Sequence, residues 1–383
     1  MNRNSATGRT LARLCCALAL AHLAIPAFAA SARVYVSAKG SDSNTGLNCA
    51  LATPCRSFAA AVTVVSSGGD VVALDTAGFG PVTITQSLTL TGPAGTYAGI
   101  TAANPGNGVT INAPGANVRI RGIVLESQQP ATTTSCTTCY PPDGIAIDIL
   151  AAANVSVENC VIAGFPNSGI LTLPPGSTQT TPLTLNVLDS VFVEDGYYGA
   201  LLLWPAHFAA GATVSANIRN VSLNGYAAYT GTGYQGIFVG DGATAAIDGS
   251  QIVGYLYGIN VGALAGGTAQ LAAVNNVLNN GLNNVAVGNY SPSGGSVSAD
   301  LGNNVLIGTS AANTAAAGAN PPPAAAVYAY GAGQTMTLNA NTISGNAVGV
   351  YVGATGQVKS YGNNQLSSNG TDVTGSLTPD GGK

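Results

Sequence analysis

The sequence predicts an all-β fold: a single-stranded, right-handed parallel β-helix with a short N-terminal capping helix. Only 7% of the 383 residues are charged, 46% are hydrophobic and 51 are glycine. This composition is typical of a folded chain with many turns and not of a disordered one. Short apolar strands recur along the chain, and asparagine recurs at one position of the repeat. These observations together predict a solenoid.

Eight four-residue strands, most of which open with glycine, define the repeat. Their starts are 22 to 26 residues apart in four of seven steps, and 30, 37 and 42 residues apart in the other three. This spacing predicts one coil per repeat, with insertions looping out of particular coils. The strands are Gly144–Ile147, Gly169–Thr172, Gly199–Leu202, Gly236–Val239, Gly258–Val261, Asn284–Val287, Ala326–Ala329 and Gly349–Val352.

The alternation of side chains within these strands predicts which residues point outward. Ile237 and Val239, for example, should face the interior, which leaves Phe238 outside. The predicted outward residues are Ala146, Leu171, Leu201, Phe238, Asn260, Ala286, Tyr328 and Tyr351. Three consecutive members are large and apolar, so we expect a stripe that either insertions of this chain or a partner covers.

A second series of elements carries a recurrent polar position. It reads Cys160, Ser190, Val221, Ser250, Asn276, Asn304, Asn341 and Asn364. Asparagine at a sharp bend bonds to a stacked asparagine and tolerates a positive φ angle. We therefore expect an asparagine ladder in which Asn304 and Asn341 are buried and hydrogen-bonded.

Residues 1–29 have the pattern of a signal peptide. Arg3, Arg9 and Arg13 precede an apolar stretch, and Ala27 and Ala29 form a small-x-small cleavage site. We expect a secreted protein, extracellular or at the cell surface, with the periplasm as a further location and no transmembrane segment after cleavage. Cleavage leaves eight basic and 15 acidic residues, a formal charge of −7. Because the basic residues are scattered singly, a nucleic-acid partner is excluded.

The rest of the chain divides into three parts. Residues 30–70 are expected to hold an N-terminal strand, a disulfide loop and the capping helix, and residues 71–372 the coils. Residues 373–383 are expected to form a flexible tail. The helix is predicted over residues 56–67, with Ser57 as its N-cap and a stop at Gly68 and Gly69.

Five cysteines remain after signal cleavage. Cys49 and Cys55 lie near the cap, and Cys136 and Cys139 lie in a polar loop. An oxidising compartment predicts one disulfide within each pair. Cys160 occupies the ladder position and is expected to be a buried free thiol. No metal site and no cofactor are predicted.

The N-terminal region resembles the start of many bacterial pectin-lyase-like β-helix proteins. The matching segments are Val34 to Gly46 (VYVSAKGSDSNTG), Pro54 to Phe58 (PCRSF) and Gly68 to Asp70 (GGD). With the coils, the resemblance covers about residues 33–372. The superfamily contains pectate lyases, polygalacturonases, mannuronan epimerases, phage tailspikes and members without known activity, so it implies the fold and no particular reaction.

The motifs of those enzymes are missing from this sequence. A polygalacturonase would show clustered aspartates with Gly-His-Gly and Arg-Ile-Lys segments, and a pectate lyase would need carboxylates for Ca²⁺ and a basic residue. The candidate catalytic residues that remain are Glu194, Asp195, His207 and Arg219. Glu194 and Asp195 would act as acid and base in glycoside cleavage, or they form a solvated turn.

The single tryptophan and several tyrosines gather within two long coils. They are Trp204, Tyr197, Tyr198, Tyr226, Tyr229 and Tyr234. Their rings suit stacking against sugars, which makes them candidate ligand-binding residues. The alternative is that they pack a long loop onto the solenoid.

Three functional hypotheses follow. The first is a non-catalytic extracellular or cell-surface β-helix that contacts glycans or another surface. The second is a polysaccharide lyase or glycoside hydrolase with a non-standard site, and the third is a structural rod or assembly component. The expected partner is a polysaccharide or cell-surface glycan, and no oligomeric state is predicted.

Overall fold

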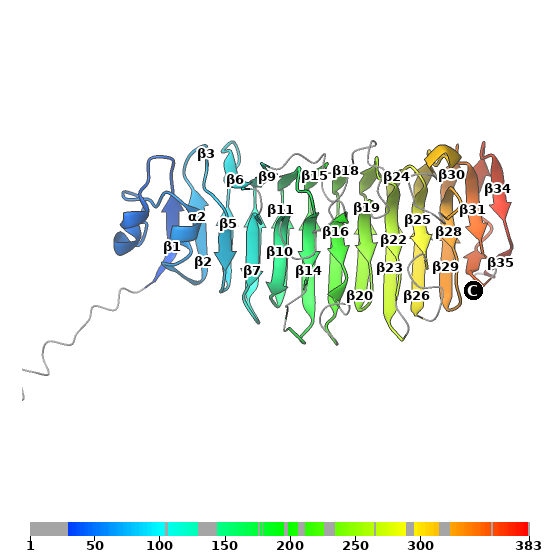
Figure 1. Ribbon diagram of the computed structural model, residues 1–383, viewed down its shortest axis with the longest axis horizontal. Helices are drawn as coiled ribbons and strands as arrows, with labels where there is room; N and C mark the ends of the chain where they lie inside the picture. The colour runs from blue at the N-terminus through cyan, green and yellow to red at the C-terminus, as the bar shows by residue number, and fades with distance from the viewer. Residues whose placement is uncertain are drawn as a thin grey trace, which may run out of the picture.

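The chain forms a long solenoid of three parallel sheets, which confirms the predicted right-handed parallel β-helix (Figure 1). The computed structural model describes residues 30–103, 106–128, 144–174, 177, 179–194, 198–205, 211–225, 234–263, 266–288, 295–313, 322–353 and 355–381. Each complete coil contributes one strand to sheet A, one to sheet B and one to sheet C, in that order.

Sheet A, with 13 strands, holds the longest strands of most coils. Its members are β1 (Ser31–Val36), β2 (Val65–Ala73), β5 (Leu88–Thr91), β8 (Asn117–Arg121), β11 (Asn154–Glu158), β14 (Leu183–Leu188), β17 (Val214–Arg219), β20 (Ala243–Asp248), β23 (Thr268–Val274), β26 (Ser296–Gly302), β29 (Gln334–Asn339), β32 (Gln357–Ser360) and β35 (Leu377–Pro379).

Sheets B and C have 11 strands each. Sheet B contains β3 (Ala77–Gly78), β6 (Ala98–Ala102), β9 (Ile123–Ser127), β12 (Val161–Ala163), β15 (Val191–Val193), β18 (Ser222–Asn224), β21 (Gln251–Val253), β24 (Val277–Asn279), β27 (Val305–Ile307), β30 (Thr342–Ser344) and β33 (Gln365–Ser367). Sheet C contains β4 (Val82–Ile84), β7 (Val109–Asn112), β10 (Ile145–Ala151), β13 (Ser168–Thr172), β16 (Gly199–Leu203), β19 (Gln235–Val239), β22 (Tyr257–Val261), β25 (Asn283–Val287), β28 (Ala325–Ala329), β31 (Val348–Val352) and β34 (Thr371–Thr374).

The core consists of apolar columns that run through the coils. One column of sheet B stacks Leu125, Ile162, Phe192, Leu223, Ile252, Leu278, Leu306 and Ile343 in register. All of these side chains are buried. Because each strand bonds to the coils before and after it, hydrophobic burial and backbone hydrogen bonding stabilise the same stack.

The buried asparagine ladder is confirmed. The Nδ2 of Asn276 donates to Oδ1 of Asn304, that of Asn304 to Asn341, and that of Asn341 to Asn364, each at 3.0 Å. The backbone N–H of each donor residue bonds to the same oxygen. The ladder thus satisfies polar groups at a buried corner between sheets A and B.

The positive φ angle lies one residue before the ladder, and not on it. The left-handed position is held by Asn159, Asp189, Asn220, Gly249, Asn275, Asn303 and Ala340. The chain bends at this exposed residue, and the next side chain then points inward to join the ladder. Therefore one residue makes the bend, and the residue after it joins the ladder.

The predicted outward series is wrong at two positions. Leu201 pairs with Ile170 and Ile237 in the core, and Leu202 takes the outward place next to Leu171 and Phe238. The error comes from aligning Gly199 with Gly169, whereas Gly199 pairs with Ser168. In the same way Asp148, which pairs with Leu171, replaces the predicted Ala146, which is buried in the core.

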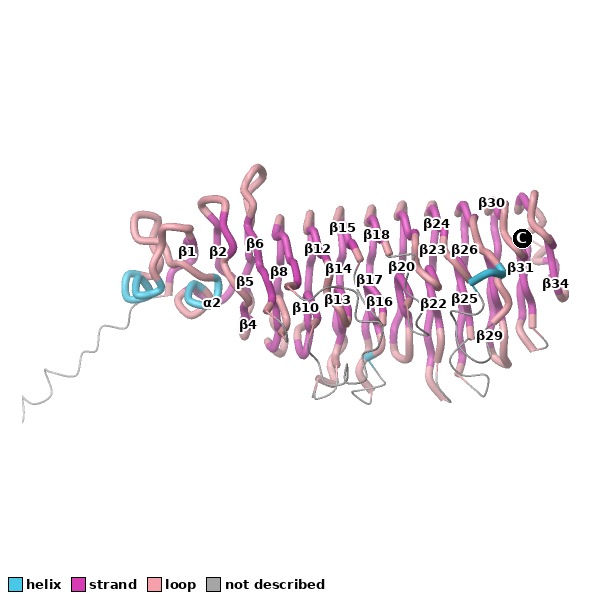
Figure 2. Tube along the Cα trace, turned by 45° about the horizontal axis from the view of Figure 1, so that its top comes forward, coloured by secondary structure: helices cyan, strands magenta, loops and turns pink. Residues whose placement is uncertain are grey.

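The N-terminal end is capped by two short helices that Figure 2 shows beside the first strands. They are the 3₁₀ helix η1 (Asp42–Leu47) and the α-helix α2 (Phe58–Ala61). Ser57 caps α2 as predicted, since its Oγ accepts the Ala60 N–H at 3.1 Å. The helix is shorter than the predicted 56–67, because the β-branched Val65 begins β2 instead.

A disulfide closes the loop beside this cap. It joins Cys49 and Cys55, as predicted, and Cys160 is a buried free thiol. Cys136 and Cys139 lie outside the described residues. Among the residues that the structure describes, no helix has the length and apolar composition needed to cross a bilayer.

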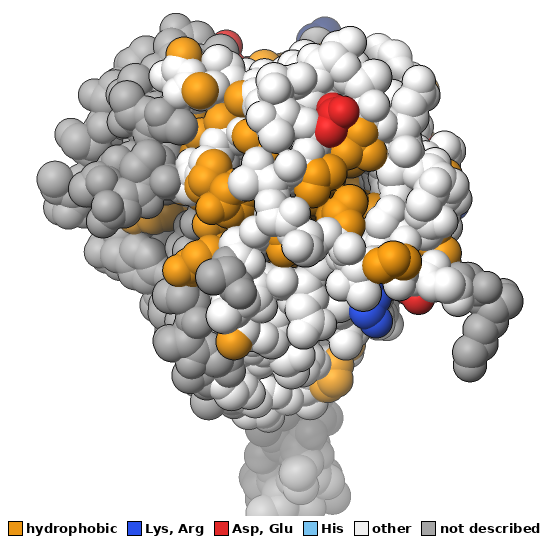
Figure 3. Space-filling view, turned by 90° about the vertical axis from the view of Figure 1, so that its right-hand side faces the viewer, with side chains coloured by type: hydrophobic (Ala, Val, Ile, Leu, Met, Phe, Trp, Pro, Cys, Tyr) orange, Lys and Arg blue, Asp and Glu red, His pale blue; other side chains and the backbone are white. Residues whose placement is uncertain are grey.

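The C-terminal end differs from the N-terminal one. β34 pairs with β31 and β35 with β32, so regular strands continue beyond the predicted boundary at residue 372. Figure 3 looks at this end and shows hydrophobic side chains gathered over it. The partly buried apolar residues of the last coils are Ala347, Val348, Tyr351, Val352, Leu366, Val373 and Leu377.

Candidate functional site

The outer face of sheet C carries an apolar cluster that is separate from the core. Leu171, Leu202 and Phe238 stack on three consecutive coils, and Ile145 joins them. All four are buried. This is the stripe expected from the sequence, with Leu202 in place of Leu201.

Trp204 and Tyr198 pack against this cluster from outside. Trp204 follows directly after β16 and is half-buried. Its ring meets Phe238 edge-on, with 5.0 Å between the ring centroids and 77° between the planes. Aromatic pairs in this geometry attract each other beyond their simple burial, so the indole is held in place.

Gly240 makes room for the Trp204 ring. A Cβ atom at position 240 would lie 2.3 Å from Cδ1 of Trp204. The Gly240 N–H donates to the carbonyl of Leu203 at 2.7 Å, which fixes the two coils at this point. The indole therefore lies directly on backbone, with part of its surface open. We call Tyr198, Trp204 and Phe238 the tryptophan cluster.

Amide side chains continue the outer face of sheet C beyond this cluster. Gln235 Nε2 donates to the Tyr198 carbonyl at 2.9 Å, and Asn260 Nδ2 donates to Gln235 Oε1 at 3.0 Å. Both side chains are buried. These bonds tie the residues beside Trp204 to the next two coils.

The other predicted ligand-binding residues have different positions. Tyr234 is buried in the core, where its ring packs on Tyr255 with 5.0 Å between centroids. It supports the coil from inside and does not form a groove edge. Tyr197, Tyr226 and Tyr229 lie outside the described residues.

The described catalytic candidates do not lie on the face that bears Trp204. Glu194 is exposed and follows β15 of sheet B, with a φ angle of 54° that fits the turn interpretation. Arg219 is exposed at the end of β17 in sheet A. Asp195 and His207 are outside the described residues. Within the part of the chain that the structure describes, neither Glu194 nor Arg219 forms an ion pair.

In the described ranges, no three His, Cys, Asp or Glu side chains come together as a metal site would require. The buried Cys160 is not a reactive thiol, because burial raises its pKa to about 11.

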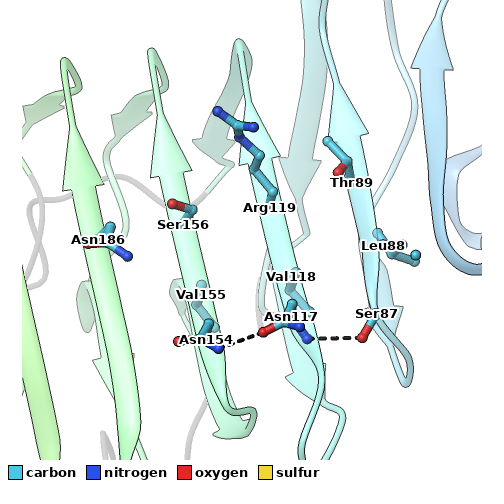
Figure 4. A pocket seen from close by; sticks show the side chains of 11 residues that line it. Ser87, Leu88, Thr89, Asn117, Val118, Arg119, Asn154, Val155, Ser156 and Asn186 are labelled. Carbon is cyan, nitrogen blue, oxygen red and sulfur yellow. Dashed lines mark hydrogen bonds between the residues drawn. The ribbon is translucent and has the colours of Figure 1, made fainter.

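A second surface is a shallow groove across β5, β8, β11 and β14 on the outer face of sheet A (Figure 4). Its volume is about 300 Å³. Its polar lining is already hydrogen-bonded: Asn154 donates to Asn117 Oδ1, and the Asn117 N–H donates to Ser87 Oγ at 3.0 Å. Arg119 in the same groove pairs with Glu158 at 2.5 Å.

Sequence reasoning missed this groove. Its signal was present as an Asn-Val pair that opens both β8 and β11, at positions 117–118 and 154–155. Equal residues at equal coil positions stack into a ladder, here an exposed one. Two polar side chains of the groove, Asn117 and Asn154, thus bond to each other.

Among the residues that the structure describes, the basic side chains lie on sheet A and in the cap. Outside the cap residues Lys39 and Arg56, every described basic side chain lies on a strand of sheet A. The five are Arg33, Arg119, Arg121, Arg219 and Lys359. The described strands of sheet C carry two acidic residues, Asp148 and Asp372, and no basic one. An acidic polymer would therefore find no counter-charge on the described part of sheet C.

No family model and no curated protein sequence matches this chain. Among solved structures it is similar to "Crystal structure of pectate lyase Pel9A", with 10% sequence identity, 91% of this chain and 78% of that chain covered, and a TM-score of 0.48.

Proposed function

We propose that this chain is a secreted β-helix protein that contacts a glycan through the tryptophan cluster and does not cleave it. The observation that carries the proposal is the half-buried indole of Trp204, which is laid on the Gly240 backbone and locked against Phe238. A fixed aromatic face suits stacking on a sugar ring, since little conformational freedom is lost on binding.

Two further observations support this proposal. The Cys49–Cys55 disulfide and the predicted signal peptide are consistent with an oxidising extracellular compartment. Glu194 follows β15 of sheet B and Arg219 ends β17 of sheet A, whereas Trp204 follows β16 of sheet C, so these two candidates do not belong to the tryptophan cluster.

The test is affinity electrophoresis of the full exported protein in gels that contain hydroxyethyl cellulose, galactomannan or polygalacturonate. We expect retardation by a neutral polymer, and a loss of at least about tenfold in affinity, about 1.4 kcal/mol, for Trp204→Ala. Trp204→Phe should keep part of the affinity because it keeps a ring. Tyr97→Ala is the matched control, because Tyr97 is an exposed aromatic beside sheet B.

Equal retardation of the wild type and Trp204→Ala would refute the tryptophan cluster as the contact site. Release of reducing ends or of ultraviolet-absorbing unsaturated products from any polymer would refute the non-catalytic role. A thermal melt of each variant separates lost contact from lost folding.

A further inference from the structure

A second group of aromatic rings lies on sheet C toward the C-terminal end. Tyr328 on β28 and Tyr351 on β31 are register partners, and their rings stack with 5.5 Å between centroids and 17° between planes. Tyr330, directly after β28, stacks on Tyr328 at 6.3 Å and 16°. Three nearly parallel rings thus occupy two neighbouring coils. We call them the tyrosine stack.

The tyrosine stack repeats the construction of the tryptophan cluster. Trp204 and Tyr330 are each the first residue after a strand of sheet C, and each lies over a glycine of the next coil. A Cβ at Gly353 would lie 2.4 Å from Cδ2 of Tyr330, as one at Gly240 would lie 2.3 Å from Trp204. The Gly353 N–H donates to the Ala329 carbonyl at 2.8 Å, the counterpart of the bond from Gly240 to Leu203.

The register places both groups in one column. Phe238, Asn260, Ala286 and Tyr328 pair in succession along sheet C. Trp204 follows β16 and Tyr330 follows β28, which is four steps along sheet C, so at about 4.8 Å per step the two rings are roughly 19 Å apart. Asn260 and Ala286 are buried, so the two aromatic groups are separate contact points and not one continuous groove.

The exposure of the tyrosine stack suits contact with a ligand. Tyr330 is 40% exposed and Tyr351 is half-buried, while Tyr328 beneath them is 6% exposed. A ring that lies over backbone and packs beside another ring is held in place, so its exposed part is preorganised for contact.

We propose that Tyr330, stacked on Tyr328 and laid over Gly353, forms a second sugar-binding subsite, and that the ligand is a neutral polysaccharide long enough to reach both aromatic groups. This inference rests on the proposed function. Charge decides the class of polysaccharide: the exposed Asp372 lies on β34, the next strand of sheet C, and no described residue of this sheet is basic. An acidic polymer such as polygalacturonate therefore meets no counter-charge among the described residues of this sheet.

Two subsites on one face make affinity depend on the length of the ligand. A polymer that engages both gains from the raised effective concentration at the second site, whereas a short fragment reaches one site only. Removing either subsite should therefore lower the affinity for polymer far more than the affinity for fragments bound at the other one.

The experiment compares intact galactomannan and hydroxyethyl cellulose with their di- and trisaccharide fragments, on the full exported protein. Polymer binding is measured by affinity electrophoresis. Fragment binding at the tryptophan cluster is followed by fluorescence, because Trp204 is the only tryptophan in the chain. We expect Tyr330→Ala to weaken binding of the retained polymer roughly 100-fold while the fluorescence titration with fragments stays unchanged.

The matched control is Tyr361→Ala, since Tyr361 is 43% exposed but follows β32 of sheet A. Tyr330→Phe should bind as the wild type does if stacking is the contact. The second subsite is overturned if Tyr330→Ala binds polymer like the wild type, or if Tyr361→Ala loses as much. In those outcomes a loss with Trp204→Ala would still support the proposed function. If the wild type is retained by none of the three polymers, both proposals fall, whereas retention by polygalacturonate alone overturns only the inference of a neutral ligand.

Discussion

The outer faces of sheets A and C belong to the same coils, yet they meet different surroundings. Along β17, β20, β23 and β26 the outward residues of sheet A are mostly exposed and polar. The strands of sheet C from β13 to β28 are buried on both faces. Sheet A therefore faces solvent, whereas most outward side chains of sheet C are buried and only a few aromatic rings are partly exposed.

This difference separates the roles of the two faces. The outward side chains of sheet A bond to their equals on the next coil, as Asn217 does with Asn186 at 3.5 Å. Such exposed contacts contribute little to stability. The outward side chains of sheet C lose their water on folding, so each contributes to the stability of its coil. Variants on the two faces should consequently differ in the free energy of unfolding.

The largest effect is expected at Phe238. Phe238→Ala removes a ring that is 1% exposed and that supports Trp204. We expect a loss of about 3–5 kcal/mol in the free energy of unfolding, measured by denaturant titration. Ser215→Ala, at an exposed position of β17 in sheet A, should change it by less than about 0.5 kcal/mol. Equal costs at the two positions would contradict the contrast between the faces.

The next effect concerns asparagine inside the coil and outside it. Asn304 bonds to Asn276, Asn341 and the Ala273 carbonyl, so Asn304→Leu leaves buried polar groups unsatisfied and should cost about 1–3 kcal/mol. Asn217→Leu makes the same change on the exposed face of sheet A and should cost little. A thermal melt of Asn304→Leu without loss of stability would refute the ladder as a stabilising element.

A third expected effect is a shift in titration on sheet C. Burial, followed by the neighbouring Tyr351, Tyr330 and Tyr257, raises the pKa of Tyr328 to about 12. An unfolded chain ionises tyrosine near pH 10, so between about pH 10 and 12 the folded protein keeps a proton that the unfolded chain has lost. The contribution of Tyr328 to the free energy of unfolding is therefore fully present below that window and decreases as the pH rises through it.

The measurement is an ultraviolet titration of tyrosinate with circular dichroism as a check on folding. The wild type should show one ionisation near pH 12 that Tyr328→Phe lacks. Tyr330→Phe should keep that late step, because it removes only one of the smaller causes. A late step that persists in Tyr328→Phe would show that another tyrosine is the more deeply buried one.

The sequence predicts those features of the fold in which one residue type recurs at the same position of successive coils. Asparagine recurs at the ladder position, so burial and side-chain bonding there were predictable. The strands of sheet A were not recognised, because their inward positions alternate large residues with alanine, as at Ala216, Ala245 and Ala299. A small residue fills the narrow interior, and it erases the hydrophobic contrast on which strand recognition depends.

The candidate site shows the same limit at finer scale. Trp204 was identifiable as the only tryptophan, but its support from Phe238 and Gly240 depends on register. Aligning the strands by their glycines gives the wrong register at Gly199, because Gly199 pairs with Ser168 and not with Gly169. The equivalence of Trp204 and Tyr330 appears only after the strands are paired, since insertions make their spacing irregular.

The smallest effect is expected for an ion pair on sheet A, and it tests how little charge contributes to the stability of this sheet. Arg119 and Glu158 form a close ion pair between β8 and β11, with 49% and 12% of the two side chains exposed. Half-exposed pairs of this kind usually contribute about 0.2–1 kcal/mol. We expect a double-mutant cycle with Arg119→Met and Glu158→Gln to give a coupling energy in that range, and added salt should reduce it because ions screen the pair.

The polymer-binding assay is a second test of the same variants. Both single variants should bind neutral polysaccharide like the wild type, because the pair lies on sheet A. A coupling energy above about 2 kcal/mol would mean that the pair on sheet A stabilises the fold substantially. A loss of neutral-polymer binding in either variant would mean that the groove on sheet A takes part in binding. Either result would contradict the division of roles between the two faces.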